Sequence, residues 1–343
     1  MPAHERRRTW LVGLLRAQND AQNARIPFIA LQLCFSDDCR RDSFDSSFGI
    51  LSSLSQKIFG VRRTMALLKN VVGIVSGGAS GLGAATAAHI VRNGGRVVVA
   101  DLASQHESFL RLATASCAEA AVAAADTTMS SPVLAFAETD VTNEDQVSAA
   151  LDLAESQFGE PVNVAISCAG IGTARKVLSR PKEGDVMPRV HSLEEFSKTI
   201  QINTVGTFNV ARLAAQRMAL REPDNEGLRG CIINTASIAG FDGQRGQVAY
   251  GASKAALIGM TLPMARDLAP YKIRVMTVAP GLFKTPLLDG LPEKVQAELG
   301  QMVPCPSRLG DPEEFGRLVG SILTNPMLNG ETIRLDGALR MPP

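Results

Sequence analysis

A glycine-rich turn between an apolar run and a helical pattern constrains this chain more than any other feature of its sequence. Residues 71–76 read VVGIVS, glycines follow at Gly77, Gly81 and Gly83, and residues 84–92 continue in a helical pattern. Glycines at such a position allow a tight turn and a close approach of backbone N–H groups to a phosphate, which the helix N-terminus also stabilises. The pattern predicts a pyrophosphate-binding turn, and a purely structural turn is the alternative.

Apolar runs alternate with helical patterns from residue 71 onward, which is typical of repeated βαβ units and a parallel sheet. Seven runs have the character of buried strands: residues 71–76, 96–101, 132–137, 162–167, 230–236, 273–279 and 331–336. We expect a single Rossmann-type, doubly wound α/β domain with a seven-stranded parallel sheet. The longest irregular pieces are expected near residues 113–131 and over 172–190. Thr142 and Asp145 resemble a capping box before a helix over 143–158.

An acidic residue ends the second expected strand. Asp101 lies 18 residues beyond Gly83, at the spacing where a carboxylate accepts hydrogen bonds from the ribose hydroxyls of an adenine dinucleotide. The alternative role for Asp101 is a helix N-cap. Its charge would repel a 2′-phosphate, and Leu102 offers no basic substitute, so we expect NAD as the cofactor.

A tyrosine and a lysine stand four residues apart at the start of a long helical pattern. Tyr250 and Lys254 therefore share one helix face and can act on the same ligand. A phenol with a pKa near about 10 is a poor base at neutral pH, and a nearby ammonium favours the phenolate. Ser237 precedes Tyr250 by 13 residues, and Asn203 lies further upstream. Taken alone, the Tyr/Lys spacing is common; the ordered set with the glycine turn and Asp101 predicts a catalytic site.

These motifs together resemble the short-chain dehydrogenase/reductase family over nearly all of residues 66–343. The G-x-x-x-G-x-G spacing differs from the G-x-G-x-x-G of larger dehydrogenases and is similar to that family's turn. The resemblance implies a catalytic tetrad. In it Ser237 steadies the substrate oxygen, Tyr250 moves the proton, Lys254 binds the nicotinamide ribose and lowers the Tyr250 pKa, and Asn203 holds a relay water.

The same resemblance implies that turns after successive strands bind the cofactor. The expected cofactor residues are Gly77, Ser80, Gly81, Leu82, Gly83, Asp101, Asp140, Val141, Cys168, Ala169, Gly170, Tyr250, Lys254, Pro280, Gly281, Phe283 and Thr285. Asp140 is expected against adenine and Thr285 near the carboxamide. Cys168 stands where the family has an amide side chain, so only the backbone contacts of this turn with the cofactor are expected here. The alternative is that Cys168 is a small buried apolar residue without a role in binding.

The chain further resembles one subfamily, the type-2 3-hydroxyacyl-CoA dehydrogenases, also called 17β-hydroxysteroid dehydrogenase type 10. The resemblance rests on three runs, NTASIAGFDGQRGQVAYGASKAALIGMTLPMARDLAPYKIRVMTVAPGLFKTPLL, PSRLGDPEEFGRLVGSIL and the ending NGETIRLDGALRMPP. It implies oxidation of a secondary alcohol to a ketone with NAD, on a 3-hydroxyacyl-CoA or a hydroxysteroid, with a homotetramer and a substrate-loop insertion over residues 172–190. The expected substrate-binding residues are Ser237, Gln247 and Tyr250. Apolar residues after Gly281 either line an acyl or steroid pocket or pack a helix.

Two competing functions remain. One is an NADPH-dependent 3-ketoacyl-carrier-protein reductase, which Asp101 argues against. The other is a binding or scaffold role in an RNA-processing assembly, which the subfamily resemblance suggests as an addition to catalysis.

Residues 1–64 do not read as a domain. Four arginines against one Glu in the first 19 residues suit a mitochondrial transit peptide, whereas an acidic cluster over residues 37–45 does not. A disordered segment and a start assigned upstream of Met65 are the alternatives. We expect a short-chain dehydrogenase/reductase domain over 65–343 and a mitochondrial location, with a cytoplasmic one as the alternative.

Charge and cysteine usage exclude several function classes. Residues 1–64 carry 10 basic and 6 acidic side chains, so residues 65–343 carry 25 and 28, a net charge of −3 that lacks the basic footprint of nucleic-acid binding. The six cysteines have no C-x-x-C and no metal-ligand spacing, so we expect free thiols and no metal site. No apolar stretch approaches the roughly 20 residues of a membrane span.

Overall fold

The computed structural model describes residues 68–123, 133–181 and 186–343. Every described residue belongs to the unit formed by residues 62–343. The expectations for residues 1–64 therefore lie outside the described residues.

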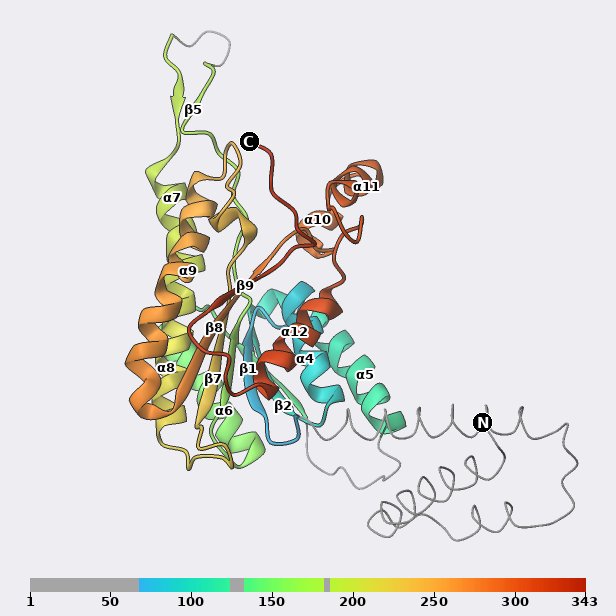
Figure 1. Ribbon diagram of the computed structural model, residues 1–343, viewed down its shortest axis with the longest axis vertical. Helices are drawn as coiled ribbons and strands as arrows, with labels where there is room; N and C mark the ends of the chain where they lie inside the picture. The colour runs from blue at the N-terminus through green and yellow to red at the C-terminus, as the bar shows by residue number, and fades with distance from the viewer. Residues whose placement is uncertain (1–67, 124–132, 182–185) are drawn as a thin grey trace, which may run out of the picture. The chain divides into compact units, whose positions relative to one another are not determined.

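A seven-stranded parallel sheet forms the centre of the described unit, as predicted (Figure 1). In spatial order its strands are β3 (Leu134–Glu138), β2 (Arg96–Asp101), β1 (Val72–Ser76), β4 (Val164–Ser167), β7 (Gly230–Thr235), β8 (Ile273–Pro280) and β9 (Thr332–Leu335). The strands read as continuous apolar runs because helices cover both faces of a parallel sheet. The order reverses between β1 and β4, which creates a crevice at the carboxyl ends of these two strands.

Two layers of helices cover the sheet (Figure 1). One face packs on α6 (Glu144–Phe158), α8 (Thr207–Ala219) and α9 (Val248–Leu268). The other face packs on α4 (Gly81–Arg92), α5 (His106–Ala123) and α12 (Pro312–Thr324). Each face of the sheet buries its own apolar cluster. These two clusters hold the strands in place, and the candidate site lies at the carboxyl ends of the strands. No helix among the described residues is long and apolar enough to cross a membrane.

The structure differs from the sequence-based expectations in two details of these helices. The cap of α6 is Asn143, whose side chain accepts a hydrogen bond from the Gln146 backbone N–H, whereas the Thr142 hydroxyl donates to Asp140. Helix α5 continues through residues 113–123, where irregular structure was expected, and residues 124–132 lie outside the described part. Alanine-rich sequence favours a helix even without a strong apolar stripe.

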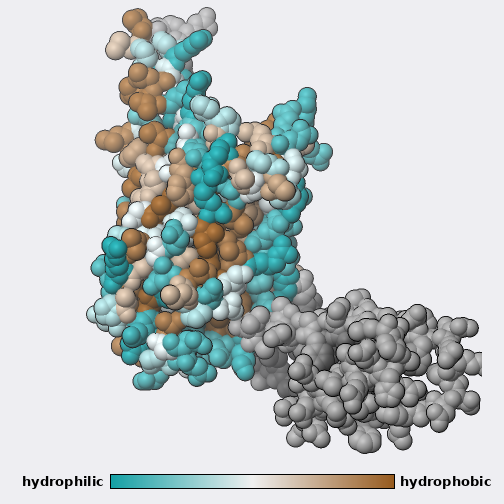
Figure 2. Space-filling view, in the orientation of Figure 1, coloured by the Kyte–Doolittle hydropathy of each residue, from teal (hydrophilic) through white to brown (hydrophobic). Residues whose placement is uncertain are grey.

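The segment expected to be irregular over residues 172–190 contains a short antiparallel hairpin, β5 (Leu178–Ser179) with β6 (Arg189–Val190). It projects from the domain, and Figure 2 shows apolar side chains gathered along it. Its exposed apolar residues are Val177, Leu178, Val186, Met187 and Val190. The hairpin leads into α7 (Leu193–Ile200), a π-helical turn η3 (Gln201–Gly206) and α8.

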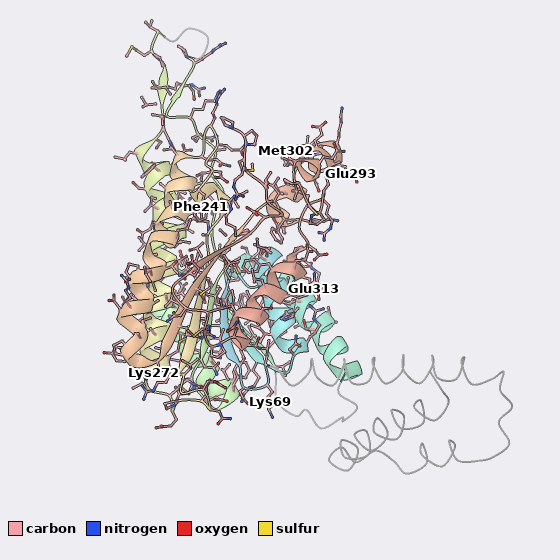
Figure 3. The ribbon with its side chains drawn as sticks, viewed as in Figure 1. Lys69, Phe241, Lys272, Glu293, Met302 and Glu313 are labelled. Atoms are coloured by element: carbon pink, nitrogen blue, oxygen red, sulfur yellow. The ribbon has the colours of Figure 1, made fainter. Side chains whose placement is uncertain are left out.

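The remaining elements cluster at the carboxyl ends of the strands. They are η2 (Ala103–Gln105), η4 (Ile238–Gly240), α10 (Pro286–Asp289) and α11 (Glu293–Gln301). The exception is η5 (Ala269–Tyr271), which lies between α9 and the start of β8. Figure 3 places Phe241 and Met302 at one end of the domain, and Lys69 and Lys272, just before strands β1 and β8, at the other.

We predict that residues 65–343 fold without the preceding segment, and that Leu68 sets the limit of truncation. Leu68 is buried, and its backbone pairs with Asn93 and Val71. A chain that begins at Met65 should unfold at the same urea concentration as the full chain. A chain that begins at Val71 loses the buried leucine and should be less stable by about 2–5 kcal/mol. Strong destabilisation of the Met65 chain would mean that residues 1–64 pack on the domain.

Candidate active site

A cleft of about 590 Å³ runs along the carboxyl ends of the central strands. It contains 15 of the 17 residues expected to bind the cofactor. These are Gly77, Ser80, Gly81, Leu82, Gly83, Asp101, Asp140, Val141, Cys168, Ala169, Gly170, Tyr250, Lys254, Pro280 and Thr285. The elements that carry them are far apart in sequence, and the common direction of the parallel strands brings them to one edge.

The glycine turn is built for close backbone approach. Gly77 has a φ of +65°, and a Cβ there would lie 2.6 Å from the Ala169 backbone nitrogen. A Cβ at Gly83 would lie 2.1 Å from the Gly77 carbonyl oxygen. The Ser80 side chain makes no cap hydrogen bond, and the first turn of α4 contains no acidic residue. The N–H groups of the first turn of α4 have no intrahelical partner and can bind an anion, which is the role that the sequence predicts for this turn.

Asp101 lies at the edge of the cleft and is tied to the glycine turn. Its Oδ2 accepts a hydrogen bond from the Ala79 backbone N–H at 3.0 Å, and its Oδ1 accepts one from the Leu102 N–H at 2.9 Å. The alternative role as a helix N-cap does not hold, because Leu102 is the cap residue of the following η2 helix. The carboxylate thus supports the turn and still borders the cleft.

Cys168 and Gly170 form part of the cleft floor. The Cys168 Sγ lies 3.4 Å from the Thr235 Oγ1 as a hydrogen bond, and burial raises the pKa of this thiol to about 11. Cys168 is therefore a neutral side chain at physiological pH. A Cβ at Gly170 would lie 3.0 Å from the Asn203 Oδ1, a tight contact that would shift this amide, and 3.5 Å from the Lys254 Nζ, an ordinary contact.

Lys254 is almost fully buried on α9, with 6% of its surface exposed. Its Nζ donates a hydrogen bond to the Thr235 carbonyl oxygen at 2.8 Å and lies 5.9 Å from the Tyr250 ring centroid. Burial lowers the pKa of Lys254 to about 8, because a charged ammonium loses its water there.

Tyr250 and Ser237 form a hydrogen-bonded pair. Burial raises the pKa of Tyr250, and the hydrogen bond with Ser237 opposes this rise. The Ser237 Oγ also accepts the Ala239 N–H at 3.1 Å, which fixes its hydroxyl at the start of η4. The pKa of Tyr250 thus responds to burial and to Ser237, while a lowering by Lys254 stays a prediction.

Asn203 lies on the π-helical turn η3 and is fully buried. Its side chain accepts a hydrogen bond from the Ile171 N–H at 2.8 Å and donates to the Ile171 carbonyl and the Ser253 hydroxyl, both at 3.0 Å. Such π turns occur frequently at functional sites. The amide therefore fixes the loop after β4, and its predicted relay water stays a prediction.

A second pocket, of about 320 Å³, opens beside Tyr250 and is mainly apolar. Ser237 and Gln247 line it, as predicted for substrate-binding residues. Gly281 and Phe283, expected at the cofactor, line this second pocket instead of the cleft, and Phe283 is buried where its ring contacts Gly310. Tyr250 borders both spaces, so a group bound in one can react with a group bound in the other.

Sequence reasoning missed several residues of the two pockets. The additional cleft residues are Ala100, Leu102, Gln105, Thr139, Ile171, Gly172, Ile202, Thr235, Ala236 and Pro286. Most of them adjoin predicted residues, so their adjacency was the available signal. No group of three His, Cys, Asp or Glu side chains that could hold a metal occurs within the described ranges.

Comparisons with known proteins agree with this geometry. Residues 71–296 match the family model described as short chain dehydrogenase. The chain is 51% identical over 277 residues to 3-hydroxyacyl-CoA dehydrogenase type-2 of Bos taurus, and 50% identical to the Homo sapiens protein of that name; each match covers 80% of this chain and 97% of the relative. A crystal structure titled 3-hydroxyacyl-CoA dehydrogenase type-2 from Mycobacterium avium is 40% identical, with a TM-score of 0.68 over 79% of this chain and 96% of that one.

The buried ammonium of Lys254 should make stability depend on pH. Because the pKa is lowered to about 8 in the folded state, the unfolded chain binds more protons between pH 8 and 10, and the folded state gains stability as the pH rises. Relative to Lys254→Met, the free energy of unfolding should increase by about 2 kcal/mol between pH 7.5 and 10. Urea unfolding of both proteins at each pH measures this. Parallel pH profiles would show that the lysine keeps its ordinary pKa.

Proposed function

Since this chain belongs to the short chain dehydrogenase family and is an oxidoreductase, we propose that it oxidises 3-hydroxyacyl-CoA thioesters to 3-ketoacyl-CoA with NAD. The observation that carries this proposal is the position of Tyr250, which borders both the cleft and the apolar pocket and is hydrogen-bonded to Ser237. A proton donor and acceptor thus lies where a dinucleotide and an apolar substrate would meet.

The described residues fit a nicotinamide dinucleotide. The N-terminus of α4 has open N–H groups for a pyrophosphate, and the closely packed positions Gly77 and Gly83 leave no room for a Cβ. Asp101 borders the cleft with oxygen acceptors for ribose hydroxyls. We propose that Lys254 and Tyr250 contact the nicotinamide ribose, and that Thr285 and Pro280 lie near the carboxamide.

In the proposed reaction, Tyr250 is the acid and base. Its deprotonated Oη accepts the proton of the substrate hydroxyl, and the Ser237 hydroxyl holds the same oxygen by a hydrogen bond. The bound nicotinamide supplies the acceptor for the hydride that leaves the carbinol carbon. Since burial raises the pKa of Tyr250, the phenolate fraction increases with pH, and oxidation should accelerate toward alkaline pH. In the reverse direction the neutral phenol donates its proton to the ketone oxygen.

We propose NAD rather than NADP as the cofactor. The Asp101 carboxylate would repel a 2′-phosphate, and its two hydrogen bonds to backbone N–H groups hold it at the edge of the cleft. The neighbouring Leu102 is apolar and 52% exposed, so it offers no cation to a phosphate. This argument also disfavours the alternative of an NADPH-dependent carrier-protein reductase.

The substrate class rests on the apolar pocket together with the activity after which the relatives are named. The pocket contains Leu282, Phe283, Leu288 and Met341 beside Ser237, a lining that suits an acyl chain. A hydroxysteroid is a second apolar candidate for the same space.

The organisation of the protein is part of the proposal. We propose that residues 65–343 are the catalytic domain, that they assemble as a homotetramer and that the protein acts in mitochondria. The net charge of −3 over these residues gives no support to an RNA-binding role.

The function is tested with the purified full chain. Each cofactor, NAD or NADP, is supplied in turn with 3-hydroxybutyryl-CoA, 3-hydroxyoctanoyl-CoA or a 17β-hydroxysteroid as substrate. Formation of the reduced cofactor is recorded. We expect turnover of the thioesters with NAD. Turnover of the steroid alone would replace the substrate assignment and leave the reaction type intact.

Substitution of Asp101 tests the choice of cofactor. Asp101→Ala should weaken NAD binding by about 1.5–3 kcal/mol, the range of a hydrogen bond to a charged group. Asp101→Asn keeps an acceptor for the Ala79 N–H and is the matched control for the shape of the turn. Both variants should narrow the preference for NAD over NADP, measured as the ratio of kcat/KM. Equal use of the two cofactors by the unchanged enzyme would contradict the assignment.

Substitution of Tyr250 tests the proton path. Tyr250→Phe removes only the hydroxyl, so folding and NAD binding should persist, while kcat should fall by about 100-fold or more, as for loss of a general acid and base. The other tyrosine of the chain, Tyr271, is 51% exposed and lines neither pocket, so Tyr271→Phe is the control and should retain full activity. Substantial turnover by Tyr250→Phe would mean that another group moves the proton.

A further inference from the structure

The C-terminal segment of the chain, residues 337–343, contributes to the apolar pocket. Met341 lines this pocket together with Tyr250 and Ser237. Its side chain is partly buried and packs against a small apolar cluster of Ile238, Val303 and Leu339. Figure 1 shows the carboxyl end of the chain at the same end of the domain as α10 and α11. The pocket thus has a wall that comes from the end of the sequence.

Backbone contacts hold this segment in a defined turn. The Leu339 N–H donates to the Asp336 carbonyl at 3.1 Å, the Ala338 N–H donates to the Asp336 carboxylate at 3.0 Å, and the Cys305 N–H donates to the Gly337 carbonyl at 3.2 Å. Leu339 is only 2% exposed and anchors the turn in the apolar cluster. Because Met341 follows this anchor by two residues, its position in the pocket is constrained.

A charged cluster ties the segment to the loop that connects Ser237 with α9. The Arg334 guanidinium pairs with Asp336 and with Asp242, both at 2.7 Å, and donates to the Leu339 carbonyl at 2.9 Å. It also lies 5.0 Å from the centroid of the Phe241 ring, which Figure 3 labels at this end of the domain.

One further contact reaches the last residues. The Gln244 Nε2 donates to the Pro342 carbonyl at 3.1 Å. The loop that carries the predicted substrate residue Gln247 and the segment that carries Met341 are therefore one connected unit.

We propose that Met341 is a substrate-specificity residue, whose side chain contacts the acyl chain of the substrate beyond its reacting carbon. This inference rests on the proposed function. Met341 packs against the apolar cluster together with Leu282, and both side chains line the pocket. Such surroundings suit an alkyl chain and not the phosphates of coenzyme A. The flexible thioether of methionine adapts to chains of different length.

The test compares substrates of two chain lengths in the full-length enzyme. Met341→Ala should lower kcat/KM for 3-hydroxyoctanoyl-CoA by about tenfold through a higher KM, because apolar contacts to the longer chain are lost. The value for 3-hydroxybutyryl-CoA should change by less than about twofold, because the short chain makes fewer apolar contacts. Met341→Leu conserves volume and should restore most of the difference. Met327→Ala is the matched control, since Met327 is 90% exposed and lines neither the cleft nor the apolar pocket.

Each outcome decides the inference. An equal loss on both substrates, together with a lower unfolding temperature, would mean that Met341 only supports the fold, and no loss would mean that it does not touch substrate. If the unchanged enzyme oxidises no 3-hydroxyacyl-CoA, the proposed function fails, and the same variants are then measured on short and long homologues of the alcohol that it does oxidise. A larger loss on the long alcohol than on the short one would support the contact between Met341 and the substrate chain. Equal values for the two alcohols would overturn this inference.

Discussion

The close contact between the end of β1 and the turn after β4 is the constraint on which the whole site depends. Gly77 approaches the Ala169 backbone so closely that no side chain fits between them, and the Cys168 N–H donates to the Ser76 carbonyl across the same gap. This contact lies where the strand order reverses. It aligns the glycine turn, the floor of the cleft and, through Gly170, the buried pair Asn203 and Lys254. The arrangement of the candidate site therefore depends on how closely these two backbone segments pack.

Much of this could be predicted from the sequence because the information is local. Buried strands of a parallel sheet are apolar on both faces, so β2 was predicted at its observed bounds, residues 96–101. The helical spacing of Tyr250 and Lys254 placed both on α9. Because parallel strands end at the same edge of a sheet, the turn residues could also be predicted to lie together. The comparisons confirmed the predicted family, and the structure confirmed the seven-stranded sheet.

The details that sequence reasoning missed depend on contacts between distant segments. Phe283, which the sequence predicts at the cofactor, lines the apolar pocket, and its ring packs toward Gly310, a residue that no local pattern connects to it. The wall formed by Met341 depends on Arg334, which bridges two acidic residues far apart in sequence. The direction of the Tyr250 pKa shift depends on the amount of water that the fold excludes.

The thiol of Cys168 has a consequence for the chemical resistance of this enzyme. Nucleophilic attack and oxidation proceed through the thiolate, and the partly buried Cys168 thiol, whose pKa is raised to about 11, supplies almost none at neutral pH. Cys231 is protected in the same way, whereas Cys305 is exposed. Among these three thiols, alkylating reagents and peroxide should therefore react first at Cys305. That order of reaction would spare the Cys168 thiol, which lines the cleft.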